Sequence, residues 1–308
     1  MMWFWFSLIT LLCWSGSDLF SKIGCRDASD KYAHLKMVMA VGVVMGLHAA
    51  FEVFVNGVYI SWDIILTYLP VSLLYILSMA LGYIGLRYIE LSISSPICNA
   101  SGALVAILAV LTMGESYPPA VLIAIGLVCV GVIGLGVVEY QEDDEARAAR
   151  QEIGNFKYSK SWLALALPVA YCILDAAGTF ADSLVLDKLS LTYVEYEASA
   201  NVAYELTFLL AGIVCFIYAV VIKKQKLVPK MEAPKYIGAC FETVGQFAYI
   251  YAIADTAHLA MSAPIISAYC AASVLWSRVF LKEKLSWKHY LCITLAVIGI
   301  VIMGVFDV

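Results

Sequence analysis

The stretch Leu91-Ser92-Ile93-Ser94-Ser95-Pro96 has a counterpart in Leu259-Ala260-Met261-Ser262-Ala263-Pro264, which lies 168 residues further along the chain. The same offset recurs across three consecutive apolar segments. Identical residues at a constant spacing over so long a region indicate an internal repeat. The identical pairs are Tyr83 and Tyr251, Ser94 and Ser262, Pro96 and Pro264, Glu115 and Glu283, Gly131 and Gly299, and Gly136 and Gly304.

Nearer the start of each copy the offset becomes 157, which pairs Asp18 with Asp175 and Trp5 with Trp162 and aligns Trp14 with Tyr171. The second copy therefore has a longer early connection, around Leu186–Tyr196. These offsets predict a first repeat over residues 1–138, a cytoplasmic linker over 139–160 and a second repeat over 161–308.

The composition is that of a membrane protein. Hydrophobic residues make up 63% of the chain, charged residues only 14%, and the mean hydropathy is +0.87. A spanning helix needs about 20 mostly apolar residues, and ten such segments are predicted. They are Trp3–Lys22, Met37–Val55, Ile64–Ile84, Leu91–Met113, Ala120–Val138, Trp162–Leu184, Glu197–Ile222, Tyr236–Ala254, Ala260–Leu281 and Lys288–Phe306.

Basic residues give the expected orientation. Ten crossings place every one of the 19 Lys and Arg residues except Lys188 on one side of the membrane. Because loops rich in Lys and Arg stay in the cytoplasm, both termini are predicted to be extracytoplasmic in a prokaryotic plasma (inner) membrane. Asp182, Asp187, Glu195 and Glu197 are expected in acidic outer loops.

Each repeat has five predicted spans, an odd number, so the second copy enters the membrane from the opposite face. The predicted fold is an all-α integral membrane protein of ten transmembrane helices in two inverted five-helix repeats. Secondary transporters use this architecture to build a midplane site.

Three kinds of residue predict local features of the spans. Pro96 and Pro264 should kink their helices. Close helix packing should be permitted by four glycines, Gly42, Gly46, Gly131 and Gly299. Glu115 and Glu283 are interpreted as structural caps at span ends.

Three motifs resemble the drug/metabolite transporter (DMT) superfamily, in its EamA-like family. They are Trp14-Ser15-Gly16-Ser17-Asp18-Leu19-Phe20-Ser21-Lys22, the segment Tyr88–Pro96 followed by Gly114-Glu115, and His258–Pro264 followed by Lys282-Glu283-Lys284-Leu285. The resemblance implies a ten-helix inverted-repeat fold with a central cavity and the export or exchange of small metabolites. Two features depart from it, because members generally keep both termini in the cytosol and because Asp18 and Asp175 are not a family-wide motif.

Ionisable residues inside predicted spans are functional candidates, since lipid disfavours them unless they face a cavity or a partner. Asp18, Asp175, Glu205 and Glu242 are such residues. Asp18 lies four residues before Lys22, so it is either paired on one helix face or free to bind a cation. Its recurrence as Asp175 favours the second interpretation. Asp18, Asp175 and Glu242 are the candidate coupling-ion or proton residues.

Tyrosines and a tryptophan within the spans complete the candidate site. A buried tyrosine hydroxyl needs a polar partner or a wet cavity, and acidic groups beside aromatic faces suit an organic cation. The predicted substrate-binding residues are Trp14, Asp18, Tyr75, Tyr83, Asn99, Tyr171, Asp175, Glu205, Glu242, Tyr249 and Tyr269.

The sequence thus predicts a secondary active transporter of a small polar organic metabolite, favoured as an organic cation or amine, working by alternating access. Proton coupling stays open at this point. One alternative is an exporter of amino acids or other zwitterions whose carboxylates serve proton coupling alone. Another is a non-transporting membrane sensor or assembly subunit.

Several other functions find no support in the sequence. It has no motif of soluble enzyme chemistry, so no enzymatic activity, cofactor or metal is expected. Its nine cysteines contain no CxxC pair, and cysteines so dispersed usually serve as small hydrophobes. The expected partners are a small-molecule substrate and the lipid bilayer, without nucleic acid. Monomer and homodimer both remain open.

Overall fold

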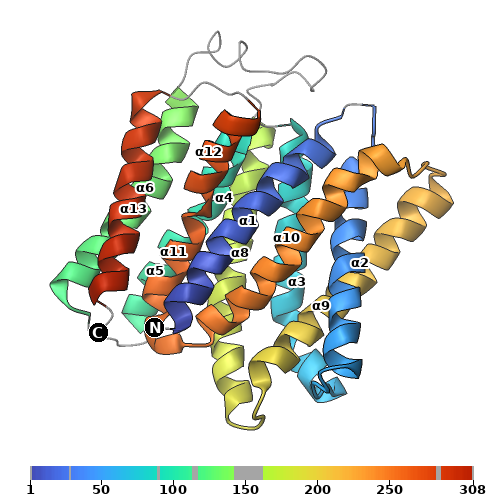
Figure 1. Ribbon diagram of the computed structural model, residues 1–308, viewed down its shortest axis with the longest axis horizontal. Helices are drawn as coiled ribbons and strands as arrows, with labels where there is room; N and C mark the ends of the chain where they lie inside the picture. The colour runs from blue at the N-terminus through green and yellow to red at the C-terminus, as the bar shows by residue number, and fades with distance from the viewer. Residues whose placement is uncertain are drawn as a thin grey trace.

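The computed structural model describes residues 2–27, 29–88, 91–112, 117–141, 162–281 and 286–306, and the regular secondary structure among them is all helical (Figure 1). The predicted linker lies outside them from residue 142 onward, as do Glu115 and Glu283. The helices are α1 (Met2–Cys25), α2 (Ala33–Phe54), α3 (Trp62–Tyr88), α4 (Leu91–Asn99), α5 (Ser101–Thr112), α6 (Pro119–Gln141), α8 (Trp162–Ser190), α9 (Tyr196–Phe216), the π-helical η1 (Ile217–Ile222), α10 (Pro229–Ile253), the 3-10 helix η2 (Thr256–His258), α11 (Leu259–Ser267), α12 (Tyr269–Phe280) and α13 (Trp287–Phe306).

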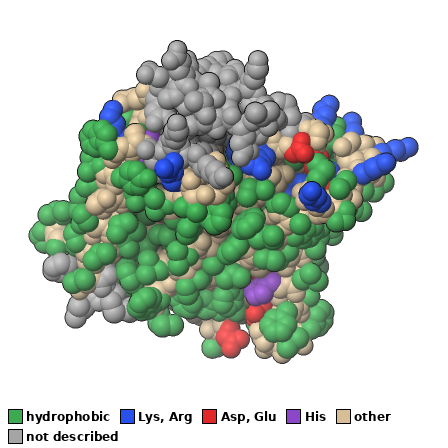
Figure 2. Space-filling model, turned by 45° about the horizontal axis from the view of Figure 1, so that its top comes forward, with side chains coloured by type: hydrophobic (Ala, Val, Ile, Leu, Met, Phe, Trp, Pro, Cys, Tyr) green, Lys and Arg blue, Asp and Glu red, His purple; other side chains and the backbone are tan. Residues whose placement is uncertain are grey.

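Seven helical segments of the described chain are long and apolar enough to cross a bilayer. The other three predicted spans correspond to α1, α10 and the shorter apolar α13. Helices α1 and α10 are less apolar because they carry polar residues such as Asp18 and Glu242 in their interiors. Figure 2 shows a broad hydrophobic surface with Lys and Arg gathered along one edge, as a multi-pass membrane protein requires. The number of ten crossings stays a prediction.

The helix contacts follow the inverted repeat. Helices at equivalent positions of the two halves pack on each other, α2 against α9 and α6 against α13. The contact between α1 and α10 is repeated as the contact between α8 and α3. In the same way, the contact between α5 and α11 is repeated as the contact between α12 and α4. Both ends of the chain lie at the same end of the bundle (Figure 1). Which side of the membrane that end faces stays a prediction from the charges.

Both helices predicted to kink are broken, and at equivalent residues. Helix α4 ends at Asn99 and α5 begins at Ser101, whereas α11 ends at Ser267 and α12 begins at Tyr269. Each break follows its proline by four residues, where the amide of Ala100 or Ala268 bonds the carbonyl of Pro96 or Pro264 at 3.1 and 3.0 Å. Discontinuous helices of this kind bring backbone polar groups into the centre of transporters.

Glycines allow the equivalent helices to approach closely, as predicted. A Cβ added at Gly131 of α6 would lie 2.7 Å from the carbonyl oxygen of Cys292 in α13. Its repeat partner Gly299 faces back, with a Cβ placed 2.6 Å from the carbonyl oxygen of Ala124. Such distances are well inside van der Waals contact with backbone atoms, which cannot move aside as a flexible side chain could.

Gly131→Ala should therefore destabilise the protein by about 1–3 kcal/mol, the usual penalty of overpacking. The matched control is Gly126→Ala on the same helix, where a Cβ has no neighbour within 4 Å. That control should be neutral or stabilising, because alanine is the better helix former by about 1 kcal/mol. Thermal unfolding of the detergent-purified variants measures both, and equal melting temperatures for the two would contradict the packing argument.

Candidate functional site

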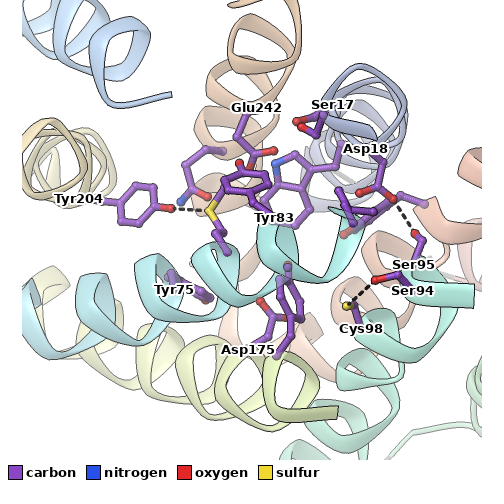
Figure 3. Close-up of a pocket in the computed structure, with 18 residues that line it drawn as sticks. Ser17, Asp18, Tyr75, Tyr83, Ser94, Ser95, Cys98, Asp175, Tyr204 and Glu242 are labelled. Atoms are coloured by element: carbon purple, nitrogen blue, oxygen red, sulfur yellow. Dashed lines mark hydrogen bonds between the residues drawn. The ribbon is translucent and has the colours of Figure 1, made fainter. Parts of the chain in front are cut away.

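A cavity lies among α1, α3, α4, α8, α9, α10 and α12, and the space within it and its mouth is about 670 Å³ (Figure 3). Three carboxylates project into it from three helices: Asp18 from α1, Asp175 from α8 and Glu242 from α10. The remaining lining residues are Trp14, Ser17, Ser21, Tyr75, Met79, Gly82, Tyr83, Leu86, Ser94, Ser95, Cys98, Tyr171, Tyr204, Gln246 and Tyr269.

Asp18 is held by two serines from different repeats. Ser95 of α4 donates to Asp18 Oδ2 at 2.5 Å, and Ser273 of α12 donates to the same oxygen at 2.9 Å. The ammonium of Lys22 donates to the carbonyl oxygen of Leu86 at 3.0 Å. The carboxylate of Asp18 is thus bonded to hydroxyl groups, and this geometry favours the interpretation in which it faces the cavity.

Asp175 occupies the equivalent position in the second repeat. Ser101, the first residue of α5 after the break, donates to Asp175 Oδ2 at 2.7 Å. Each repeat therefore supplies one carboxylate, and the broken helix of the other repeat supplies a serine to it: Ser101 to Asp175 and Ser273 to Asp18. A hydroxyl group donates a hydrogen bond to a carboxylate without neutralising its charge. The ionised carboxylates of Asp18 and Asp175 therefore keep a negative charge that can attract a cation.

Glu242 adds a third carboxylate without a repeat counterpart. Helix α10 presents it together with Gln246, four residues later and on the same face. Ser17 of α1 is a hydrogen-bond partner of the Glu242 carboxylate. Residues Asp18 and Ser17 are neighbours in sequence, so α1 brings the Glu242 and Asp18 sites close together.

Aromatic rings form much of the remaining wall. Trp14 packs against Tyr249, with ring centroids 4.9 Å apart, and edge-on against Tyr269 at 5.8 Å. Tyr204, which the predicted site omitted, donates to the sulfur of Met79 at 3.3 Å and also lines the cavity. Trp14, Tyr204 and Tyr269 thus border the space that the carboxylates surround.

A second, smaller cavity of about 360 Å³ lies beyond this wall. It shares Trp14, Tyr171, Asp175 and Tyr269 with the first, so these residues separate the two spaces. The predicted residues Asn99 and Tyr249 line the second cavity rather than the first. Its other lining residues are Ser101, Gly102, Val105, Thr179, Ala263, Ile266 and Ser267.

Glu205 lies apart from the other predicted residues and lines neither cavity. Its buried carboxylate is bonded to Nδ1 of His48 at 2.8 Å, across the contact between α2 and α9. His48 Nε2 also lies 3.5 Å from Glu52, and Asn56 donates to Glu52. Sequence reasoning placed Glu205 in the site because the partner that satisfies it belongs to a helix far away in the sequence.

Asp182 corrects the expectation that it belongs to an acidic outer loop. It lies inside α8, its residue is fully buried, and it accepts hydrogen bonds from Tyr68 at 2.6 Å and Tyr75 at 3.2 Å. Asp175, Thr179 and Asp182 are spaced i, i+4 and i+7, which puts them on one face of a helix. That spacing was the signal in the sequence that could have identified Asp182.

The comparisons with known proteins agree with this geometry. The sequence pattern of the EamA-like transporter family matches residues 1–137 and 192–305. The chain belongs to the EamA-like transporter family. This agrees with the predicted membership of the DMT superfamily and with a function as a membrane transporter.

A protein of known crystal structure resembles this EamA-like transporter in fold, with a TM-score of 0.64. The two are 14% identical, and the match covers 98% of this chain and 96% of the other. At that identity the likeness supports the fold alone. A search of curated proteins found no match.

The His48–Glu205 pair generates a stability prediction. His48→Ala should destabilise this EamA-like transporter by about 1–3 kcal/mol, since it leaves a buried carboxylate without its partner. Glu205→Leu alone should also destabilise, whereas the double variant should lose less than the two single losses added together. Thermal unfolding of the four proteins measures this coupling, and strictly additive losses would show that the pair contributes no interaction energy.

Proposed function

We propose that this EamA-like transporter exchanges a small organic cation, an amine, for protons by alternating access. One observation carries the proposal: the central cavity has three carboxylates, Asp18, Asp175 and Glu242, and none of its described lining residues is Lys, Arg or His. A site of that composition lacks a positive charge of its own. A cationic ligand would supply it.

The surrounding groups support an organic ligand in particular. The cavity combines aromatic rings with a few convergent polar groups, the lining typical of small-molecule sites. The aromatic rings of Trp14, Tyr83 and Tyr171 provide apolar faces on which an alkylammonium group can rest, through cation–π attraction. A bare metal ion would use the carboxylates but would gain nothing from these rings.

Proton exchange follows from the cost of burying charge. Carboxylates in a low-dielectric interior are stable only when paired or neutralised. The serines that bond Asp18 and Asp175 donate hydrogen bonds but bring no charge. An empty cavity therefore favours protonated carboxyl groups, and an amine that enters as a cation displaces protons. Inverted repeats then allow the same site to open to either side.

Asp175→Asn should abolish amine binding while leaving the protein folded, since asparagine keeps the size of the side chain and removes its charge. A thermal-shift screen with amines, quaternary ammonium compounds, amino acids and sugars measures binding. A ligand at 100 times its Kd stabilises by about 2.7 kcal/mol. Asp187→Asn is the matched control, because Asp187 is exposed on the same helix α8.

The outcomes separate the alternatives. Stabilisation by amines in the wild type and in Asp187→Asn, but not in Asp175→Asn, supports the proposal. Stabilisation by amino acids alone would contradict cation selectivity and favour the zwitterion exporter. No ligand and no flux in proteoliposomes would favour a sensor or assembly subunit.

Amine binding should weaken as the pH falls, because protons and the amine compete for the same carboxylates. Binding of a quaternary ammonium ion, whose own charge does not titrate, isolates this effect from ionisation of the ligand. Isothermal titration calorimetry in buffers of different ionisation enthalpy should show protons released on binding. Affinity independent of pH, with no proton release, would contradict the exchange mechanism.

A further inference from the structure

A cluster of hydroxyl groups from α3, α8 and α10 surrounds one carboxylate in the second half of α8. Helix α8 runs toward the end of the bundle that carries the termini (Figure 1). Asp182 accepts from Tyr68 at 2.6 Å and from Tyr75 at 3.2 Å. Tyr75 and Tyr249 share a hydrogen bond, and Thr179 bonds both, at 3.3 and 2.9 Å. All five residues are buried.

Asp182 lacks a compensating charge. It lies in the candidate span Ala166–Ser190, and within the described part of the chain the groups bonded to it are neutral hydroxyls. An ionised carboxylate at such a position costs several kcal/mol or more unless a cation accompanies it. The residue therefore needs a positive charge that the described side chains around it do not provide.

The titratable groups around Asp182 confirm this account. Helix α3 supplies Tyr68 and Tyr75, α9 supplies Tyr204 and α10 supplies Tyr249, all neutral hydroxyls. Helix α5 has no titratable residue, and α4 supplies only Cys98. On α8 itself Asp175 lies two turns away, and Asp187 and Lys188, five and six residues after Asp182, are both exposed. The one basic side chain of η2, His258, is held at 2.8 Å by Asp255.

The surroundings of Asp182 limit how large a cation can reach its carboxylate. Asp182 lines neither of the two cavities, so its carboxylate does not border either space in which an organic cation could rest. The described residues also contain no group of three or more His, Cys, Asp or Glu side chains arranged to hold a metal ion. A proton alone needs no space beyond that of the carboxyl oxygen.

We propose that Asp182 is a second proton-binding site, which passes protons between the terminus-bearing side of the membrane and the central cavity. The proposal rests on the proton exchange proposed above for Asp18, Asp175 and Glu242. It adds a route to that exchange that no amine can follow, because the route consists of side-chain hydroxyls in direct contact.

The hydrogen bonds define this route. Protonated Asp182 donates to Tyr75, which in turn donates to Thr179 or Tyr249. Each hydroxyl gains one proton as it loses one, so the network ends with its original composition. Tyr75 lines the first cavity, and Thr179 and Tyr249 line the second together with Asp175. The last hydroxyl, that of Thr179 or Tyr249, releases its own proton to water in the second cavity, from which Asp175 can take it up. Asp182 is then an ionised carboxylate until it takes up another proton, and the hydroxyl groups turn back to their first orientation.

At the opposite end of the bundle, buried carboxylates are paired with lysines. Buried Lys36 lies 3.0 Å from Asp30 and 3.4 Å from Glu232, and buried Lys235 lies 3.1 Å from Glu232. The pair of Lys36 with Glu232 joins α2 of the first repeat to α10 of the second, and the two lysines supply the positive charges that balance the carboxylates. At the terminus-bearing end, by contrast, α3 and α8 meet at Tyr68 and Asp182, and no described basic side chain is bonded to that carboxylate.

Infrared spectroscopy of the full chain in lipid tests the site without any substrate. A pH titration should show a protonated carboxyl band that is lost in Asp182→Asn and kept in the matched control Asp187→Asn. Tyr68→Phe keeps the carboxyl group and removes one donor, so it should shift the pH midpoint of that band. If neither Asp182→Asn nor Tyr68→Phe alters the spectra, Asp182 does not bind a proton and the proposal is wrong.

Transport in proteoliposomes tests the route, with labelled choline as the probe because its charge is permanent. Asp182→Asn should reduce choline uptake driven by a pH gradient to the level of protein-free liposomes, and it should retain choline–choline exchange. If choline uptake driven by the pH gradient is the same in Asp182→Asn as in the control Asp187→Asn, the proposal is wrong. If the wild type moves no choline at all, the proposed cation transport fails, and the infrared result still decides whether Asp182 is a proton site.

Discussion

The scarcity of counter-charge inside a bilayer governs this structure. Lipid cannot solvate an ionised carboxylate, so each one in a span needs a partner, a proton or a wet cavity. The described chain uses all three solutions. Glu205 pairs with His48, Asp18 and Asp175 face a cavity while bonded to serines, and Asp182, enclosed by tyrosines, is the carboxylate for which we propose a proton. The position of each carboxylate thus indicates which cation it accepts.

The inverted repeat explains why the cavity carboxylates are bound across the two halves. Prolines 96 and 264 break α4–α5 and α11–α12 at equivalent residues, near the crossing of α5 and α11. Serines just beyond the breaks then reach the carboxylates of the opposite repeat, Ser101 to Asp175 and Ser273 to Asp18. A movement of one half against the other changes these bonds. The same groups that would bind a cation therefore also connect the moving parts.

The fold was largely predictable from the sequence because its signals are periodic and local. Pro96 and Pro264 predicted kinks where the two helices are broken, and the recurrence of Asp18 as Asp175 drew attention to the two acids that line the cavity. The errors concern partners and helix ends. Glu205 is satisfied by His48, a contact between residues 157 apart that one sequence does not reveal. Asp182 lay near the predicted end of its span at Leu184, but α8 continues to Ser190 and buries it.

The two ends of the bundle differ in chemistry although they are related by the repeat. At one end the halves are joined by ion pairs between α2 and α10, whose opening exposes charges of both signs to water. At the other end α3 and α8 are joined by hydroxyl–carboxylate bonds, whose strength changes when the carboxyl group takes up a proton. The ion pairs are buried, so salt screens them little, whereas the bonds of the buried carboxyl group respond to proton concentration. In the exchange proposed above, the end that joins α3 to α8 is therefore the one whose bonds change with pH.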